Sequence, residues 1–161
     1  MRVIFFLFFS YCITGCNNPT QQGAVDKKSD SLDQYHNVYK PGFGEFMSSI
    51  QMHHAKLWFA GINENWQLAD FEIHEMQEAA DGIQKFCPDR PETKMIELFL
   101  TPALNSMNDA IAQKKIALFK DRFVFLTNSC NNCHKENSFG FNMVTIPTTP
   151  PFSNQDFKIN H

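Results

Sequence analysis

Residues 119–134 read FKDRFVFLTNSCNNCH, and the spacing of their apolar side chains decides the fold class. The apolar side chains recur at alternating four- and three-residue steps, in the order Phe119, Phe123, Leu126, Cys130 and Cys133. Side chains with this spacing share one face of an α-helix, because the helix has about 3.6 residues per turn. The stretch therefore predicts an amphipathic helix whose apolar face is buried against other elements.

Three further stripes with the same kind of spacing precede this helix in the sequence. They are Met47, Ile50, His54, Leu57 and Gly61; Trp66, Ala69, Ile73, Met76, Ala80 and Ile83; and Ile96, Leu100, Leu104, Met107 and Ile111. The alternation of apolar and polar residues that is typical of strands is absent from residues 41–133. Four amphipathic helices joined by short links predict an all-α fold, an antiparallel four-helix bundle over residues 41–135.

Residues beside and beyond these stripes carry further expectations. Pro102 lies inside the third stripe, and we expect a kink or a less regular helix start there because proline lacks the N–H that continues a helix. Four acidic residues fall off the second stripe and are expected to face water: Asp70, Glu72, Glu75 and Glu78. Residues 136–161 are rich in Phe and Pro, and they predict an extended tail that packs across the bundle, with room for one short strand.

The composition limits what the chain can do. It has 161 residues, is 43% hydrophobic and carries a formal net charge of −3. These values fit one domain with a full hydrophobic core, and they disfavour a protein that binds nucleic acid by neutralising phosphates. No paired nucleophile and base stands at a recognisable spacing, so the sequence does not predict an enzyme.

The N-terminal residues 1–16 read MRVIFFLFFSYCITGC and contain an apolar run of nine residues. This run has the length of a signal-peptide core and is too short to cross a bilayer as a helix. Residues 13–16, ITGC, follow this run and resemble the lipobox of bacterial lipoproteins, in which the cysteine is lipidated. The resemblance predicts an exported protein with a lipid anchor at Cys16, on the periplasmic side or the cell surface, and a flexible tether over residues 17–40. An ordinary secretory peptide is the alternative.

The segment Cys130-Asn131-Asn132-Cys133-His134 carries the chemistry of the chain. It has the CxxCH pattern that attaches haem c, in which the two thiols bond to the vinyl groups and the adjacent imidazole binds the iron. Residues three and four apart share a helix face, so both cysteines and the histidine point toward one planar macrocycle. The two asparagines between the cysteines are expected to be solvated. A disulfide or redox dithiol and a zinc site are the alternatives.

A CxxCH motif at the C-terminal end of a fourth amphipathic helix resembles the class II c-type cytochromes, that is, cytochrome c′ and its low-spin relatives. The resemblance covers residues 41–135 and implies one haem c attached covalently at Cys130 and Cys133. It also implies that His134 is the proximal iron ligand and that Met47, near the start of the first helix, is the sixth ligand. The same analogy allows a homodimer.

Other residues could fill the sixth position on the iron. His54 lies on the inward stripe two turns further along the first helix, and Met143 could fold back from the tail. Without any of these ligands the iron would be five-coordinate. The sequence therefore predicts a monohaem cytochrome that transfers single electrons to or from a redox partner outside the cytoplasm. A five-coordinate haem protein that binds gases, and a haem-free structural lipoprotein with a Cys130–Cys133 disulfide, stay open as alternatives.

Overall fold

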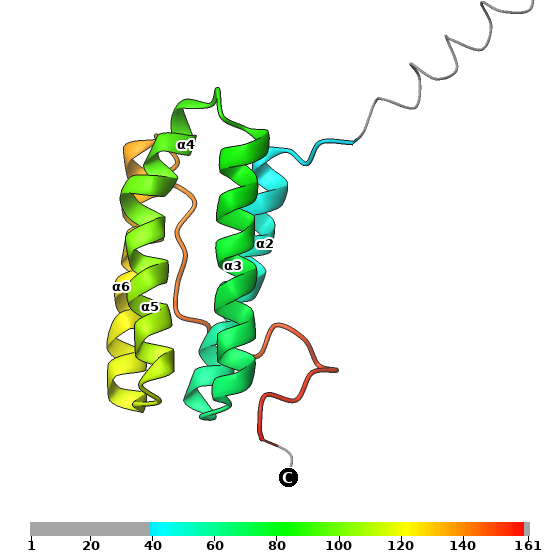
Figure 1. Ribbon diagram of the computed structural model, residues 1–161, viewed down its shortest axis with the longest axis vertical. Coiled ribbons are helices and arrows are strands. Elements are labelled where there is room, and N and C mark those ends of the chain that lie inside the picture. The colour runs from blue at the N-terminus through cyan, green and yellow to red at the C-terminus, as the bar shows by residue number, and fades with distance from the viewer. Residues whose placement is uncertain (1–38, 160–161) are drawn as a thin grey trace, which may run out of the picture. The chain divides into compact units, whose positions relative to one another are not determined.

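The computed structural model describes residues 39–159, and all the regular secondary structure in this part of the chain is helical, as the sequence predicts (Figure 1). Four helical segments follow one another: α2 (Phe43–Ile62), α3 (Trp66–Phe86), a third segment made of α4 (Pro91–Met95), η1 (Ile96–Leu100) and α5 (Thr101–Ala112), and α6 (Ile116–Glu136). No strand occurs within the described residues, so the short strand for which the tail had room is absent from them. The predicted signal peptide, Cys16 and nearly all of the predicted tether lie outside the described residues.

Capping side chains and tight links set the ends of the helices. The Gly42 N–H donates to the Glu45 carboxylate (3.0 Å) at the start of α2. Asn65 Oδ1 accepts from the Leu68 N–H (3.2 Å) at the start of α3. The link before α3 and the link before α6 each contain a residue in the left-handed region of φ, namely Glu64 at 55° and Lys114 at 52°. A residue in this conformation ends one helix abruptly and lets the next helix begin soon after it.

The irregularity expected near Pro102 takes the form of a π-helical turn, η1, which lies directly before α5, and Pro102 lies in the first turn of α5. Pro102 has no N–H to donate to the carbonyl four residues earlier, so a regular α-helix would lose a hydrogen bond there. The Thr101 N–H donates instead to the Ile96 carbonyl, five residues earlier, and the Thr101 hydroxyl donates to the same carbonyl at 3.3 Å. The proline therefore widens one turn and leaves the third segment continuous.

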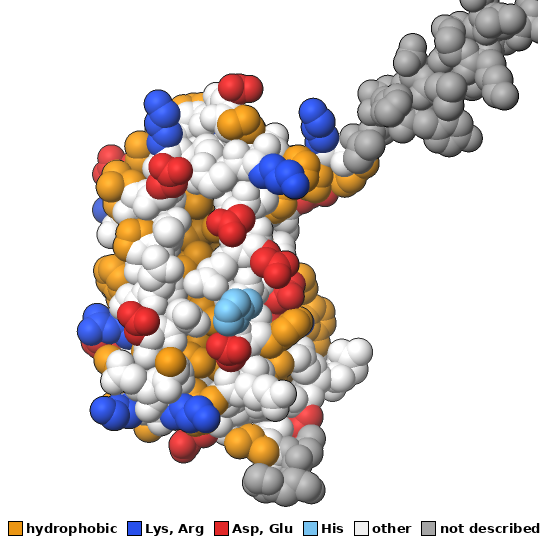
Figure 2. Space-filling view, in the orientation of Figure 1, with side chains coloured by type: hydrophobic (Ala, Val, Ile, Leu, Met, Phe, Trp, Pro, Cys, Tyr) orange, Lys and Arg blue, Asp and Glu red, His pale blue; other side chains and the backbone are white. Residues whose placement is uncertain are grey.

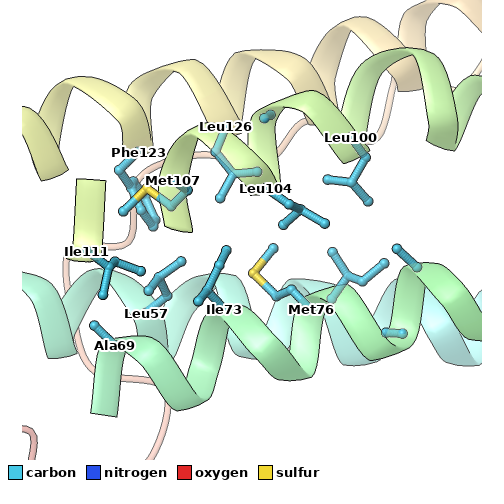
Figure 3. Close-up of a cluster of buried hydrophobic side chains, with 14 of the residues drawn as sticks. Leu57, Ala69, Ile73, Met76, Leu100, Leu104, Met107, Ile111, Phe123 and Leu126 are labelled. Atoms are coloured by element: carbon cyan, nitrogen blue, oxygen red, sulfur yellow. The ribbon is translucent and has the colours of Figure 1, made fainter. Parts of the chain in front are cut away.

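The four apolar stripes face one another and form one core (Figure 3). Contacts link α2 with α3, α3 with α5, α5 with α6, and α6 with α2. The fully buried side chains between them include Leu57, Ile73, Met76, Leu104, Met107, Phe123 and Leu126. Because burial of one such side chain contributes roughly 1.5–3 kcal/mol, this core accounts for the association of the helices into a bundle.

At one end of the bundle, aromatic rings fill the space between α2, α3 and α6. Phe119 is fully buried, its ring stacks on Trp58 at a centroid distance of 6.3 Å, and Trp66 meets it edge-on at 6.0 Å. Gly61 makes room for this ring, because a Cβ atom at Gly61 would lie 1.9 Å from Phe119 Cζ. We call the region formed by Trp58, Gly61, Trp66 and Phe119 the aromatic end.

The chain after α6 runs back along the helices (Figure 1). Ile146 packs against the core, and Phe157 is buried against Phe59 of α2 at a ring-centroid distance of 5.6 Å. The Asn65 amide donates to the Phe157 carbonyl (3.4 Å), which ties the tail to the link before α3. The described part of the tail therefore packs on the helices without regular secondary structure.

Glu72 is fully buried, so the prediction that it faces water is wrong. His53 lies on α2 beside the inward stripe, is itself buried, and donates from Nδ1 to Glu72 Oε2 at 2.6 Å. Lys56 Nζ lies 3.7 Å from the other carboxylate oxygen. Hydrophobic periodicity could not show this pairing, because a buried carboxylate is stabilised by a specific partner on another helix and not by its own stripe. Asp70 and Glu78 are exposed, as predicted.

The outer surface of the helices is mixed in character. Figure 2 shows one face of the molecule, where acidic and basic side chains are interspersed and hydrophobic side chains emerge between them. Within residues 39–159, no helix combines the length and the apolar character needed to cross a bilayer.

Candidate functional site

A cavity of about 360 Å³ lies at the other end of the bundle from the aromatic end. Its walls come from the first half of α2, the link before α4, η1, the end of α6 and the segment that follows α6. Much of the wall is apolar and consists of Phe43, Met47, Ile50, Ile96, Leu100, Phe139 and Val144. The volume lies within the roughly 300–1,000 Å³ that is typical of ligand and cofactor pockets. We call it the motif cavity, because the CxxCH motif forms part of its wall.

The last turns of α6 bring the three residues of the motif together. Cys130, Cys133 and His134 all line the motif cavity, because α6 continues in helical form through Glu136 and keeps residues three and four apart on one face. Cys133 is buried, and the Asn137 amide donates to its carbonyl (2.7 Å) and reaches its Sγ at 3.6 Å. The motif therefore presents two thiols and one imidazole to the same cavity.

The surroundings of the two thiols keep them protonated. Burial, together with the neighbouring Cys133, raises the pKa of Cys130 to about 12. Burial also raises the pKa of the Cys133 thiol, although the contact with Asn137 opposes this. Redox dithiols depend on a lowered thiol pKa, because the thiolate is the reactive species. These surroundings therefore do not suit the redox-dithiol alternative.

His134 is held by one short hydrogen bond from the tail. Its Nδ1–H donates to the Asn142 carbonyl at 2.5 Å, since a carbonyl oxygen can only accept. This bond places the hydrogen of the neutral ring on Nδ1 and leaves the lone pair on Nε2. A histidine that binds a metal through one ring nitrogen almost always donates the other ring N–H to a carbonyl, carboxylate or water. His134 therefore has the tautomer and the support of a metal-binding imidazole.

Asn131 is not the solvated residue that the sequence suggested. Its side-chain amide pairs in both directions with the backbone of Val144: Nδ2 donates to the Val144 carbonyl (2.9 Å), and the Val144 N–H donates to Oδ1 (2.8 Å). The partner lies thirteen residues further along the chain, in an irregular segment, so no spacing rule in the sequence could have indicated it. Asn132 is exposed, as expected.

The two α2 candidates for the sixth ligand, Met47 and His54, both line the motif cavity. His54 is buried, and its Nε2 lies 2.9 Å from Thr127 Oγ1. The Thr127 hydroxyl donates to the Phe123 carbonyl (2.9 Å), and it has only one hydrogen, so His54 Nε2 carries the hydrogen and donates to Thr127. Burial lowers the pKa of His54 to about 4, so the ring is neutral near pH 7. Met143, the third candidate, is 57% exposed and is not part of the cavity wall.

The charges at the motif cavity are few. Among the described residues that line it, Arg90 is the one Lys or Arg and Glu92 the one Asp or Glu. The two form a bidentate pair, with Arg90 Nη2 2.8 Å from Glu92 Oε1 and Arg90 Nε 3.2 Å from Glu92 Oε2. This hydrogen bonding lowers the pKa of Glu92 and raises the pKa of Arg90. The sequence analysis did not single out either residue, because an arginine in a proline-rich link is an ordinary surface residue by pattern alone.

In the part of the chain that the structure describes, no group of three or more His, Cys, Asp or Glu side chains is arranged to hold a metal ion. Cys87, Cys130 and Cys133 are free thiols in the structure. Comparison of the chain with protein-family models, with curated proteins and with solved structures finds no match.

Proposed function

We propose that the chain is a monohaem c-type cytochrome that transfers single electrons outside the cytoplasm. The observation that carries the proposal is the Nδ1–H hydrogen bond from His134 to the Asn142 carbonyl, next to the half-buried Cys130 thiol and the buried Cys133 thiol in one largely apolar cavity. That arrangement leaves His134 Nε2 as a free donor atom for an iron. A haem iron takes four ligands from its porphyrin, so it needs only one or two from the protein.

The residues that line the motif cavity suit a haem. The Cys130 and Cys133 thiols would attach it, each S–H adding across one vinyl group so that a C–S bond forms and the hydrogen passes to the neighbouring carbon. When bound, haem supplies an iron that gains and loses one electron. His134 would bind this iron, and the Asn142 carbonyl would hold the imidazole in place. The apolar walls would exclude water, which tends to raise the reduction potential.

Two further residues of the motif cavity have proposed roles. Met47 is our candidate for the sixth ligand, because it lines the motif cavity and takes the position near the start of the first helix that the resemblance implies. Arg90 is the candidate partner for the haem propionates, because it is the one described basic side chain on the cavity wall. Glu92 would compete for the same guanidinium.

The wider setting is proposed from the sequence. We propose the antiparallel order of helices that characterises class II c-type cytochromes. In support, His54 of α2 contacts Thr127 of α6, and Met47 and His134 share the motif cavity. The lipid anchor at Cys16, the tether, the export to the periplasmic side or cell surface, the redox partner and a homodimer are proposed on the sequence alone. We propose no enzymatic activity.

Haem attachment is the direct test of the proposal. The full chain is expressed in a host that matures c-type cytochromes, and the purified protein is stained for haem after denaturing electrophoresis and weighed by mass spectrometry. We expect one covalent haem in the natural chain and in Cys87→Ser, and none in the double variant Cys130→Ser/Cys133→Ser. A colourless natural chain with free thiols, or with Cys130 joined to Cys133, would refute the proposal in favour of a haem-free lipoprotein.

The sixth ligand decides between electron transfer and gas binding. If Met47 binds the iron, Met47→Leu should change the low-spin visible spectrum and open the reduced protein to carbon monoxide. Met52→Leu is the matched control, because Met52 lies on the same helix but is 38% exposed and outside the motif cavity. Rapid carbon monoxide binding by the natural chain would favour the five-coordinate alternative.

A further inference from the structure

The segment that supplies the Asn142 carbonyl is held to α6 by hydrogen bonds more than by burial. The Phe139 N–H donates to the His134 carbonyl (2.7 Å), and the Asn142 N–H donates to the Phe139 carbonyl (2.8 Å). The side chains of this segment give little anchorage, since Phe141 is 84% exposed and Met143 is 57% exposed. Further hydrogen bonds, and not burial of side chains, must therefore fix the position of the Asn142 carbonyl relative to the His134 imidazole.

The two-way pairing between Asn131 and Val144 meets this need. Its hydrogen bonds of 2.8 and 2.9 Å fasten the backbone two residues after Asn142 to the helix turn that precedes His134. A pairing through both a donor and an acceptor fixes the orientation of the backbone as well as its distance. Asn131, His134, Asn142 and Val144 thus form a closed set. Helix α6 carries the amide and the imidazole, and the tail carries the three backbone groups that meet them, namely the Asn142 carbonyl and the Val144 N–H and carbonyl.

We infer that Asn131 is a positioning residue for the proximal ligand, which sets the electron donation of His134 by holding the Asn142 carbonyl against Nδ1–H. The inference rests on the proposed haem function. A strong hydrogen bond at Nδ1 makes the imidazole a better donor and favours the ferric iron. Loss of the two hydrogen bonds between Asn131 and Val144 lengthens the bond from His134 Nδ1–H to the Asn142 carbonyl, so the reduction potential of the haem rises.

The test compares substitutions at neighbouring positions of the motif. Asn131→Leu removes both hydrogen bonds at similar size, and Asn131→Asp keeps the acceptor for the Val144 N–H but loses the donor. Asn132→Leu is the matched control, because Asn132 is exposed and lies between the same two cysteines. A tenfold loss of the preference for ferric iron corresponds to a rise of about 59 mV. We expect a rise of this order for Asn131→Leu, a smaller one for Asn131→Asp and none for Asn132→Leu.

Amide hydrogen exchange gives a readout that does not depend on the iron. The Val144 amide should exchange faster in Asn131→Leu than in the natural chain and in Asn132→Leu. Unchanged potential and unchanged exchange at Val144 in Asn131→Leu would overturn the inference while leaving the haem function intact. A natural chain without haem would instead refute the proposed function, and the inference with it. If both Asn131 variants lose haem attachment, an unchanged melting temperature supports positioning, and a collapsed one shows a merely structural role.

Discussion

The apolar stripe of helix α6 contributes side chains to both ends of the bundle. At the aromatic end these side chains fill the core, and at the other end they line a cavity. At the aromatic end, Phe119 is fully buried against Trp58 and Trp66, and its ring packs so close to the Gly61 backbone that no Cβ atom fits between them. At the other end, the same stripe continues as Cys130 and Cys133 on the wall of the motif cavity. The helix geometry is the same at both ends, so the difference comes from the size of the side chains.

The comparison shows how a site is made from a core without a change of fold. A thiol fills far less space than a phenyl ring, so small side chains on the inward face leave volume where large ones would fill it. Polar groups then come from α6 and from the tail, namely the Asn131 amide and the Asn142 carbonyl. We expect the aromatic end to supply stability, and we have proposed that the motif cavity holds the haem. The predictions that follow test whether these two tasks can be separated.

The largest effect is expected at the aromatic end. Phe119→Ala should lower the free energy of unfolding by about 3–5 kcal/mol, because a fully buried ring is removed from a packed site. Phe125→Ala on the same helix is the control, since Phe125 is 43% exposed and its loss should change stability by no more than about 0.5 kcal/mol. Urea denaturation of both variants measures the difference. Equal effects would show that the aromatic end is not the stabilising region.

The second effect concerns the buried charges between the two ends. His53→Leu leaves the Glu72 carboxylate buried without its 2.6 Å hydrogen bond and should cost about 3–5 kcal/mol of stability. The double variant His53→Leu/Glu72→Leu should recover most of this loss, because no buried carboxylate then remains unpaired and the Lys56 side chain keeps some access to water. Both are measured by chemical denaturation. A single variant as stable as the natural chain would mean that Lys56, 3.7 Å away, suffices as a partner.

The sequence predicted the helices and the faces that they bury, because these depend on hydrophobic periodicity. It missed the side chains whose burial depends on a hydrogen-bond partner in another element. The four stripes and the placement of the CxxCH residues on one face follow from the repeat of the helix, and the irregular turn near Pro102 follows from the missing proline N–H. Glu72 was misplaced because its burial depends on His53, which belongs to another helix. Asn131 was misjudged because its partner is a backbone group of the irregular tail. The spacing of apolar residues within one helix does not indicate which hydrogen bonds its side chains make with another element.

The third prediction concerns the pH dependence of the haem-free chain, made as Cys130→Ser/Cys133→Ser. The folded pKa of His54 is about 4, below its ordinary value of 6.5, so between these values the unfolded chain binds a proton that the folded chain does not. Stability should therefore fall as the pH drops from 6.5 to 4, by about 3 kcal/mol from this residue, with no contribution above pH 6.5. His54→Gln should flatten that slope, and His74→Gln, at an exposed position, should not. Identical slopes in both variants would contradict the assignment.

The smallest effect returns to the closeness of packing at the aromatic end. Gly61→Ala places a methyl group 1.9 Å from the Phe119 ring, a clash that costs about 1–3 kcal/mol, against about 1 kcal/mol gained in helix propensity. Gly44→Ala meets no atom within 4 Å and should show the gain alone. Thermal melting of the two variants should thus shift in opposite directions. Phe119→Leu added to Gly61→Ala should reduce the clash. If it does not, the aromatic end is closed by the backbone of α2 and not by the ring.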